Sequence, residues 1–313
     1  MTRAPAALGI DVGGQSIKAV AVSPSGEVLG QESVRTGEEM DAGHLADAVV
    51  SLRAALDSSG AAPIGVGMAG VLDRAGSLQG APHLPLLVGR NIAGLLAERL
   101  GCRVAVHNDA DCAAMAEGWG GAADGFEDYL MIVIGTGMGS GLVLGGGLRA
   151  GSSGYGCEFG HMMVVHGGRN CGCGNRGCLE AYVSETAARH LVEESGAALQ
   201  AAVAQRRASG GGGYAQAAFE LGQAGDAEAE RLAEQMVDVL GAAIGSVVNV
   251  LDLTTIVLGG GIAPGVLARL PRLRSAAAAQ LFARSVDTLT IVAASRGPLA
   301  GAIGAARLGM LAR

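Results

Sequence analysis

The chain has 313 residues, of which half are hydrophobic and 3% aromatic, and its formal net charge is −7 at pH 7. This length suggests about two domains, and the negative charge argues against nucleic acid, which is bound through basic stripes. Apolar residues come in short runs, none near the ~20 residues of a membrane span, and no apolar signal segment precedes the first expected strand. We therefore expect a cytoplasmic protein with no membrane partner.

The first half of the chain alternates strand-like and helix-like segments. In chain order we expect strands at 8–13, 16–23 and 27–34, a helix over 40–59, a strand at 63–70, a helix over 91–101, a strand at 103–109 and a helix over 109–119. The first three strands are joined by tight turns, which predicts an antiparallel meander. The helix over 40–59 is predicted from apolar residues at helical spacing.

The second half opens by repeating the design of the first. VIGTGMGSG at 133–141 aligns with IDVGGQSIK at 10–18, and both place a glycine-rich turn between apolar strands. This repeat predicts two lobes of similar topology that face each other, with coincidence between two glycine-rich hairpins as the alternative. Further on we expect a helix over 226–251, a strand at 254–261, another helix, a strand at 289–295 and a terminal helix over 301–312. The alternation predicts α/β lobes with helix-covered sheets.

The two glycine-rich turns are candidates for phosphate contacts, because glycine lets backbone amides approach a phosphate unobstructed. Their candidate residues are Gly13, Gly14, Thr136 and Gly137. Asp11 at a strand end could hold Mg²⁺ through water, and Lys18 could neutralise phosphate charge. Each turn alone could be an ordinary hairpin, but two related turns favour a pair of loops that bind one polyphosphate from opposite sides. The glycines at 259–261 follow a strand, as is usual where a nucleotide lies against the backbone.

The segment VHNDAD at 106–111 carries a candidate general base. Asp109 emerges from a buried strand into a helix start, and Asn108 beside it could orient a substrate hydroxyl. The alternative is that Asp109 is the N-cap of the helix, which is a common role for aspartate at such a position.

Three cysteines and a histidine have the spacing of a metal site. They are His161, Cys171, Cys173 and Cys178. Such a set predicts a closed, structural Cys₃His zinc site with no open position for water. His166 is a rival ligand, and reduced, metal-free cysteines are the alternative. Glu158 shares one helical face with His161, three positions later, and Glu180 follows the last cysteine closely.

The order of these motifs resembles the ROK family of sugar kinases nearly end to end, from Asp11 to the terminal GAIGAARLG. The motifs are DxGG, ND, GTGxGxG, ExGH, CxCGxxGCxE and GGG. The resemblance implies an α/β fold of the actin-like ATPase (ribonuclease H-like) type, with two lobes and a cleft between them. The small lobe is expected at 1–117, completed by a terminal helix at about 298–313. The large lobe, with the zinc loop, is expected at 118–297.

The resemblance also implies roles for single residues, with Asp109 as the catalytic base. The residues expected at the sugar are Gly70, Asn108, Asp109, Glu158, His161 and Glu180. Those expected at ATP and its metal are Asp11, Gly13, Gly14, Gln15, Lys18, Thr136 and Gly137, with Gly259, Gly260 and Gly261 at the adenosine. Those expected on zinc are His161, Cys171, Cys173 and Cys178.

The sequence departs from the family pattern at four positions. Gln15 stands where threonine is common, Asp111 where asparagine is common, His83 where asparagine is frequent, and Cys157 where glycine usually precedes the glutamate. None of these changes removes a residue with an assigned chemical role, but they bear on the choice of sugar.

The expected activity is ATP- and Mg²⁺-dependent phosphorylation of glucose at the 6-hydroxyl group. Alternatives are an N-acetylmannosamine or N-acetylglucosamine kinase, a fructokinase, and a glucokinase that uses polyphosphate. Family repressors carry a helix-turn-helix module, for which ten residues before Asp11 leave no room. A non-catalytic sugar sensor is the remaining alternative, and the resemblance implies a homodimer formed through the larger lobe.

Overall fold

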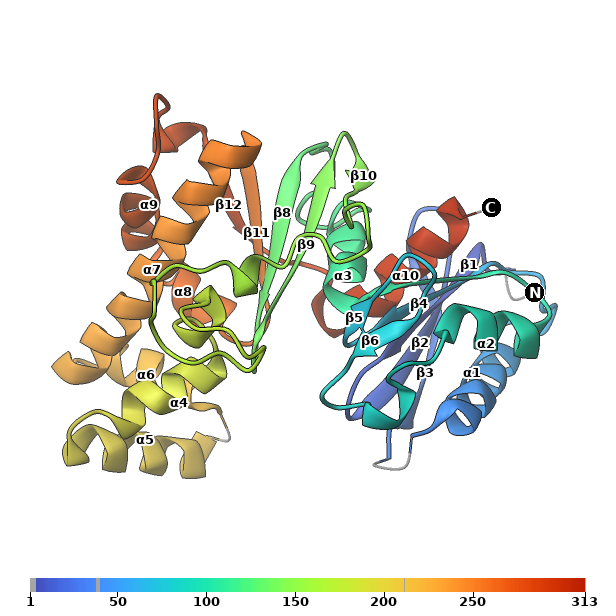
Figure 1. Ribbon diagram of the computed structural model, residues 1–313, viewed down its shortest axis with the longest axis horizontal. Coiled ribbons are helices and arrows are strands. Elements are labelled where there is room, and N and C mark those ends of the chain that lie inside the picture. The colour runs from blue at the N-terminus through green and yellow to red at the C-terminus, as the bar shows by residue number, and fades with distance from the viewer. Residues whose placement is uncertain (1–3, 38–39, 211, 313) are drawn as a thin grey trace. The chain divides into compact units, whose positions relative to one another are not determined.

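The computed structural model describes residues 4–37, 40–210 and 212–312, which form two compact units (Figure 1). Unit 1 takes the described residues of Met1–Asp128, Gly141–Cys157 and Ala294–Arg313. Unit 2 takes those of Tyr129–Ser140 and Glu158–Ala293. The division expected from the resemblance, a small lobe at 1–117 with a helix at about 298–313 and a large lobe at 118–297, stays a prediction.

The first sheet lies in unit 1 and has the strand order β3-β2-β1-β4-β7. Its strands are β1 (Ala7–Val12), β2 (Ser16–Val22), β3 (Val28–Arg35), β4 (Ile64–Met68) and β7 (Val104–Asn108). β1, β2 and β3 are antiparallel, which confirms the predicted meander, while β4 and β7 run parallel to β1. The short strands β5 (Val71–Leu72) and β6 (Leu78–Gly80) pair separately, and a 3₁₀ turn, Pro85–Leu87, follows them.

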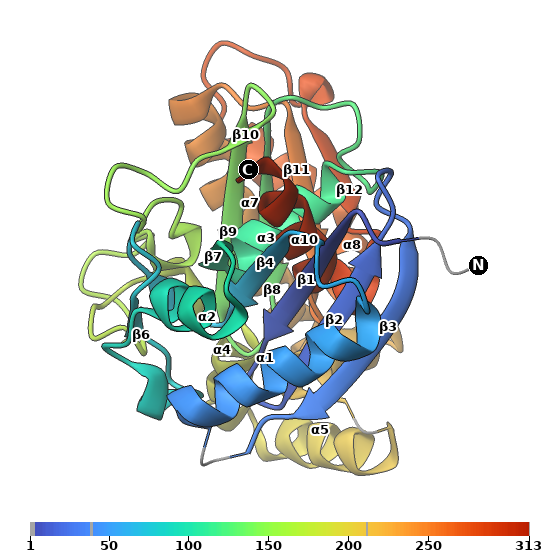
Figure 2. The ribbon, with the colours of Figure 1, turned by 90° about the vertical axis from the view of Figure 1, so that its right-hand side faces the viewer.

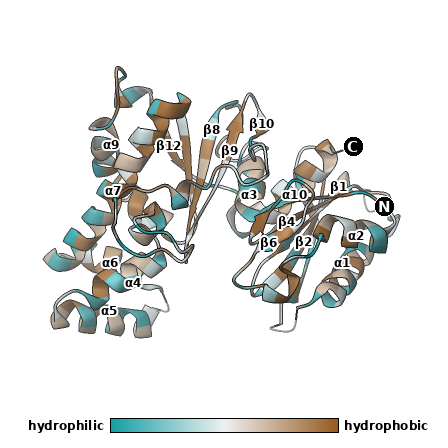
Figure 3. Ribbon diagram, in the orientation of Figure 1, coloured by the Kyte–Doolittle hydropathy of each residue, from teal (hydrophilic) through white to brown (hydrophobic). Residues whose placement is uncertain are grey.

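Helices cover both faces of the first sheet (Figure 2). α1 (Ala42–Leu56) and α2 (Ile92–Leu100) lie on one face, where Leu45, Val49 and Leu96 enter the main core. α3 (Asp109–Glu117) and α10 (Ala300–Leu311) lie on the other face. In Figure 3 the strands are mainly hydrophobic and the hydrophilic residues are concentrated on helices and loops, as this layering requires.

α10 packs against the first sheet and α3 at backbone distance. A Cβ atom at Gly9 would overlap the carbonyl oxygen of Ala302, and a Cβ atom at Gly65 would overlap that of Ala305. On its other side, a Cβ atom at Gly304 would overlap the carbonyl oxygen of Cys112 in α3. Only glycine fits these three positions, so they determine how closely α10 approaches the first sheet and α3.

The chain entering α10 is held by a buried carboxylate. Glu117, the last residue of α3, is fully buried. Its carboxylate accepts hydrogen bonds from the backbone N–H groups of Ala122 at 2.7 Å, Ser295 at 2.9 Å and Arg296 at 2.8 Å. A buried charge is tolerated when its hydrogen-bond capacity is met, as it is here.

The second sheet has the order β10-β9-β8-β11-β12. Its strands are β8 (Tyr129–Ile134), β9 (Met138–Leu144), β10 (Gly147–Leu148), β11 (Thr255–Gly259) and β12 (Thr290–Ala293). β8, β11 and β12 are parallel, and β10 is antiparallel to β9. Numbered by appearance within each sheet, both sheets read third, second, first, fourth, fifth. The predicted repeat of one topology is therefore confirmed.

Unit 2 is rich in helices. They are α4 (Glu185–Glu193), α5 (Ala197–Gly210), α6 (Tyr214–Gln223), α7 (Ala227–Leu251), α8 (Ala263–Leu267) and α9 (Leu270–Ala278), with 3₁₀ turns at Phe159–His161, Leu179–Ala181, Val286–Thr288 and Gly297–Leu299, the last of which belongs to unit 1. The sequence predicted α7 but not α4, α5 or α6. α5 consists mostly of alanine, glutamine and arginine, with two buried residues, so its apolar periodicity is weak.

Among the described helices, α7 is long and apolar enough to cross a membrane by length and composition. Its buried side packs against α6 and α9 within unit 2. Glycines allow close contact with α9, since a Cβ atom at Gly241 would lie 2.6 Å from that of Ala276. A place in the core of unit 2 accounts for the apolar composition of this helix.

We predict that Gly304→Ala lowers the free energy of unfolding by about 2 kcal/mol, because the added methyl group would overlap α3. Intrinsic helix propensity works in the opposite direction and favours alanine by ~1 kcal/mol. Gly43→Ala in the exposed first turn of α1 is the matched control, because a Cβ atom there would come no closer than 3.4 Å to another atom, and it should leave stability unchanged or raise it. Urea unfolding of both variants measures the difference, and a stabilised Gly304→Ala protein would contradict the packing argument.

Candidate functional site

The predicted site residues fall into two groups, one in each unit. Unit 1 holds Asp11, Gly13, Gly14, Gln15, Lys18, Gly70, Asn108 and Asp109. Unit 2 holds Thr136, Gly137, Glu158, His161, Cys171, Cys173, Cys178, Glu180, Gly259, Gly260 and Gly261.

The turn between β1 and β2 is held by neighbours on two sides. The backbone N–H of Gly13 donates to the carbonyl oxygen of Ser16 at 3.1 Å, and the hydroxyl of Thr36 donates to the carbonyl oxygen of Gly13 at 2.8 Å. A Cβ atom at Gly14 would lie 2.6 Å from the Cβ atom of His83. Glycine at position 14 is therefore required by His83, one of the departures from the family pattern.

Asp11 lies at the end of β1, directly opposite Lys18 on β2. Burial raises the pKa of the Asp11 carboxyl above its usual range, and the positive charge of Lys18 opposes this shift. The ammonium group of Lys18 donates to the carbonyl oxygen of Pro298 at 3.2 Å. Gly301 at the start of α10 backs the carboxylate closely, since a Cβ atom there would lie 2.8 Å from Cγ of Asp11.

Asn108 and Asp109 lie where β7 leads into α3. Asn108 is the N-cap of α3, because its Oδ1 accepts the N–H groups of Ala110 at 2.7 Å and Asp111 at 3.3 Å. Its Nδ2 donates to the carbonyl oxygen of Gly70 at 3.0 Å. Asp109 is the first helical residue, and its Oδ1 accepts from the N–H of Ala110 at 2.9 Å. The N-cap of α3 is therefore Asn108 and not Asp109.

The first turn of α3 also holds a buried thiol. Burial raises the pKa of Cys112 well above its usual range, and the charges of Asp111, Asp11 and Asp109 add to the shift, in that order. These interactions place Asp11 and Asp109 in the surroundings of one side chain. The thiol stays protonated at neutral pH, so Cys112 is a structural residue rather than a nucleophile.

Four ligand atoms converge in the loop between β10 and α4. They come from His161, Cys171, Cys173 and Cys178, and all lie within 4.8 Å of one another. Sγ of Cys171 lies 3.6 Å from Nδ1 of His161, and Sγ of Cys173 lies 3.8 Å from that of Cys178. The exposed His166 is not part of the group.

These distances fit a tetrahedral zinc ion. Zinc–sulfur bonds of about 2.3 Å and zinc–nitrogen bonds of about 2.1 Å, at tetrahedral angles, separate two sulfurs by about 3.8 Å and a sulfur and a nitrogen by about 3.6 Å. The observed separations agree with both values. With Nδ1 directed at the thiols, Nε2 of His161 is the ring nitrogen left to other partners.

Glu158 precedes the 3₁₀ turn Phe159–His161, so the expected helical turn between Glu158 and His161 is present. Loss of hydration raises the pKa of the Glu158 carboxyl; the charge of Glu180 adds to the shift and that of His161 opposes it. Cys157 before it has a φ of +65°. Left-handed backbone is costly for a residue other than glycine, which explains why glycine is usual at this position in the family.

Glu180 contacts the turn between β8 and β9. Its Oε2 accepts the N–H of Met138 at 2.7 Å, and a Cβ atom at Gly137 would overlap this oxygen. Its Oε1 lies 3.6 Å from Sγ of Cys171. One carboxylate therefore joins the cysteine cluster to the second glycine-rich turn.

The glycines at 259–261 end β11 beside a pocket. Gly260 has a φ of +85°, and a Cβ atom there would overlap the carbonyl oxygen of Ile134. The adjoining pocket has a volume of about 330 Å³ and lies between α6 and α8, and its lining residues are Gln216, Phe219, Glu220, Gln223, Gly261, Ile262, Pro264 and Gly265. Its size and its mixture of apolar and polar lining residues suit a planar organic ring.

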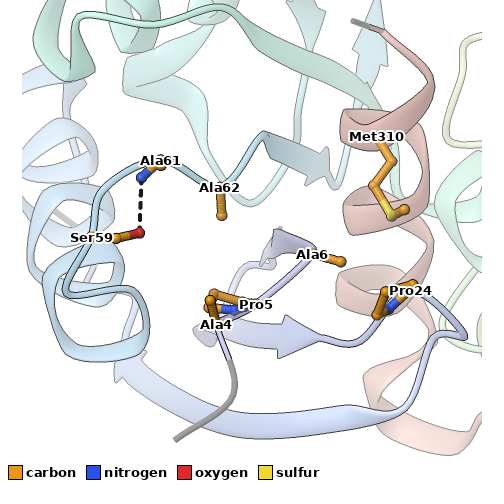
Figure 4. Close-up of a pocket in the computed structure, with 8 residues that line it drawn as sticks. All are labelled: Ala4, Pro5, Ala6, Pro24, Ser59, Ala61, Ala62 and Met310. Atoms are coloured by element: carbon orange, nitrogen blue, oxygen red, sulfur yellow. Dashed lines mark hydrogen bonds between the residues drawn. The ribbon is translucent and has the colours of Figure 1, made fainter.

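A second pocket, of about 390 Å³, lies in unit 1 and contains none of the predicted site residues (Figure 4). Its lining residues are Ala4, Pro5, Ala6, Pro24, Ser59, Ala61, Ala62 and Met310. None of them is ionisable, and Ser59 is engaged with the N–H of Ala61. This lining offers no group for acid–base or metal chemistry.

Sequence reasoning missed two threonines that hold the glycine-rich turns. Thr36 bonds the carbonyl oxygen of Gly13, and Thr186 bonds that of Thr136 at 3.0 Å. Each contact joins residues far apart in the chain and involves a common side chain and a backbone group. A single sequence holds no signal for such a pair.

Comparison with known proteins gives concordant matches. The model of the ROK family matches residues 7–310. A glucokinase of Thermotoga maritima is 30% identical over 307 residues, which cover 96% of each chain. An N-acetyl-D-glucosamine kinase of Pasteurella multocida is 30% identical over 274 residues, covering 81% of this chain and 83% of that protein. A ROK family glucokinase of Streptomyces griseus, solved with glucose and AMPPNP, has a TM-score of 0.78 and 29% identity over 96% of this chain and 98% of its own.

The family match covers the chain from β1 to α10. The structural match covers almost the same length, and it confirms the expected α/β fold of the actin-like ATPase type. The family match extends over the two glycine-rich turns, the β7–α3 junction and the cysteine cluster. This chain therefore belongs to the ROK family.

Proposed function

We propose that this ATP-dependent sugar kinase transfers the γ-phosphoryl group of ATP to the 6-hydroxyl group of glucose. The glucokinases of Thermotoga maritima and Streptomyces griseus support glucose, and the AMPPNP bound to the latter supports ATP as donor. The observation that carries the proposal is the β7–α3 junction. There Asn108 is the N-cap and Asp109 is the first helical residue, which places the carboxylate of Asp109 at the start of α3, directly after β7.

Asp109 is proposed as the general base. It would accept the proton of the 6-hydroxyl group as that oxygen attacks the γ-phosphorus, a contribution of ~10²–10⁴-fold in rate. The positive end of α3 stabilises its charged form. Phosphoryl transfer otherwise depends on positioning and on charge stabilisation. The backbone amides of both glycine-rich turns would position the phosphates and stabilise their charge, with Gln15 and Lys18 beside the first turn.

Asp11 is proposed to hold Mg²⁺, which neutralises phosphate charge when bound. Burial and the close backing by Gly301 keep this carboxyl in one place. Because burial raises its pKa, metal binding has to displace the proton from a larger fraction of Asp11 than at an exposed aspartate. Nucleotide binding in the presence of Mg²⁺ should therefore weaken as the pH falls through the raised pKa.

The sugar hydroxyls are proposed to be bound by carboxylates, an imidazole and an amide. Glu158, His161 and Glu180 would contribute from unit 2. Asn108 would contribute the second hydrogen of its amide, since one already serves Gly70. A site that hydrogen-bonds a particular hydroxyl rejects analogues lacking it by as much as ~10⁴–10⁵-fold.

The cysteine cluster is proposed to bind zinc as a structural ion. Four protein ligands leave the metal no open position, so it would brace the loop rather than activate water. The brace would fix the ring of His161, with Nδ1 on zinc and Nε2 turned to the sugar. The adenine ring is proposed to occupy the pocket beside Gly261.

A second candidate function is the phosphorylation of N-acetylglucosamine or N-acetylmannosamine. The Pasteurella multocida N-acetyl-D-glucosamine kinase favours it. The small residues of GSSGYG just before Cys157 are proposed to admit an acetamide group. Fructose is a third candidate sugar.

A coupled assay over these sugars, with polyphosphate replacing ATP in one series, tests the assignment. We expect the highest kcat/KM with glucose and ATP, and a higher value for any other pair overturns it.

We further propose a cytoplasmic homodimer. Light scattering of the purified protein should give a mass of about twice the 31.0 kDa of one chain, and a monomer at assay concentrations would refute this.

We predict that Asp109→Asn lowers kcat by ~10²–10⁴-fold and leaves the dissociation constant of glucose within a few fold, because an amide can bind a hydroxyl but cannot take its proton. Steady-state kinetics and calorimetric titration with glucose measure the two effects. Asp124→Asn, at an exposed acid of the same unit, is the control and should keep full activity. An Asp109→Asn enzyme with most of its kcat would exclude the assigned base.

We predict that Cys173→Ser lowers the zinc content, the melting temperature and the affinity for glucose, because binding of a structural metal contributes directly to folding. The KM for glucose should rise by about tenfold, a larger change than that in kcat. Cys102→Ser, at a cysteine outside the cluster, should change none of these quantities. Zinc loss with unchanged KM and melting temperature is the result that would count against the brace.

A further inference from the structure

The turn between β8 and β9 is held by one short segment of unit 2, residues 178–186. The N–H of Glu185 donates to the carbonyl oxygen of Gly135 at 2.9 Å. The hydroxyl of Thr186 donates to the carbonyl oxygen of Thr136 at 3.0 Å, and its N–H approaches the same oxygen at 3.4 Å. With the bond from Met138 to Glu180, this segment contacts three successive parts of the turn.

These contacts fix the directions of the amides that the turn can offer. A peptide unit is planar and trans, so its C=O and N–H groups point in opposite directions and move together. Holding the carbonyl of Gly135 sets the direction of the N–H of Thr136. Holding the carbonyl of Thr136 likewise sets that of Gly137. The N–H of Met138 is occupied by Glu180, which leaves Thr136 and Gly137 as the amides whose orientation this segment controls.

The same segment carries residues of the other proposed subsites. It begins at Cys178, in the cysteine cluster, and passes through Glu180 in the 3₁₀ turn Leu179–Ala181. It ends in the first turn of α4, where the side chain of the N-cap Ser184 accepts the N–H of Ala187 at 3.0 Å. Between these two elements, the N–H groups of Tyr182 and Val183 both donate to the carbonyl oxygen of Leu179, so the segment is also hydrogen-bonded within itself.

We propose that Thr186 is a positioning residue for the nucleotide: its hydroxyl orients the Thr136–Gly137 peptide so that the amide meets a phosphate of ATP. The segment that carries Cys178 and Glu180 therefore also sets nucleotide affinity. This inference rests on the proposed function, in which the turn binds phosphate.

The first glycine-rich turn has the same arrangement in unit 1. There the hydroxyl of Thr36 donates to the carbonyl oxygen of Gly13 at 2.8 Å, and its N–H donates to that of Gln15 at 3.0 Å. Thr36 follows strand β3, whereas Thr186 lies in a helix, so the two contacts do not arise from a common local structure. Because both related turns are held by a threonine hydroxyl, we infer that the turns themselves need a hydrogen bond to the carbonyl at this position.

The test replaces Thr186 by valine, which has the same shape without the hydroxyl. Calorimetric titration measures the dissociation constants of AMPPNP with Mg²⁺ and, separately, of glucose. We expect Thr186→Val to weaken AMPPNP binding by about threefold to tenfold, the usual effect of one lost hydrogen bond, and to leave glucose binding within twofold. Thr186→Ser keeps the hydroxyl and should restore AMPPNP binding.

Thr288→Val is the matched control, because the hydroxyl of Thr288 also donates to a backbone carbonyl of unit 2, that of Ser285. It should leave both constants unchanged. The proposal is overturned if Thr186→Val binds AMPPNP as the unchanged protein does, if it weakens glucose equally, or if serine fails to restore binding. Phosphorylation of glucose by the unchanged protein is measured in parallel, and its absence would refute the proposed function instead.

Discussion

Unit 1 depends on the backbone-to-backbone contact between α10 and the elements that it joins. Gly9 and Gly65 on the sheet side, and Gly304 within the helix, bring α10 against β1, β4 and α3 with no side chain between them. Asp11 lies one residue before the end of β1 and Asp109 begins α3, so this contact sets the relation between the two carboxylates. Gly301 adds a direct contact to Asp11 itself. The positions of the proposed metal ligand and the proposed base thus follow from the packing of one glycine-rich helix.

The electrostatics of this region are arranged around α3. Its first turn carries two aspartates where the helix dipole favours negative charge, and its last residue is the buried Glu117. The negative charge of the Glu117 carboxylate is stabilised by hydrogen bonds from backbone N–H groups. The thiol of Cys112 lies among the acids in its neutral form, so it adds no further negative charge. Asp11, Asp109 and Asp111 therefore concentrate negative charge around the first turn of α3.

Much of the fold and part of the candidate site could be predicted from the sequence. The meander, the repeated topology and the four ligands at His161, Cys171, Cys173 and Cys178 follow from periodicity and from spacings that few other structures use. The cap of α3 was ambiguous, because asparagine and aspartate are equally good caps and stand side by side at 108 and 109.

Other features could not be predicted, for physical reasons. α5 has too few buried positions to give a periodic pattern. The contacts of His83 with Gly14 and of the two threonines with the turns join distant residues through common side chains. They become visible only when tertiary structure brings the segments together.

The placement of α10 also has a consequence for how the protein folds. This helix is synthesised after all of unit 2, yet it covers one face of a sheet whose strands lie within residues 7–108. Until α10 has been synthesised, that face of the first sheet stays uncovered. By then β8, β11, β12 and the helices between them can already assemble. Contacts of such long sequence separation slow folding and expose apolar surface in the meantime. On the ribosome, the half of the protein made first is thus the half completed last.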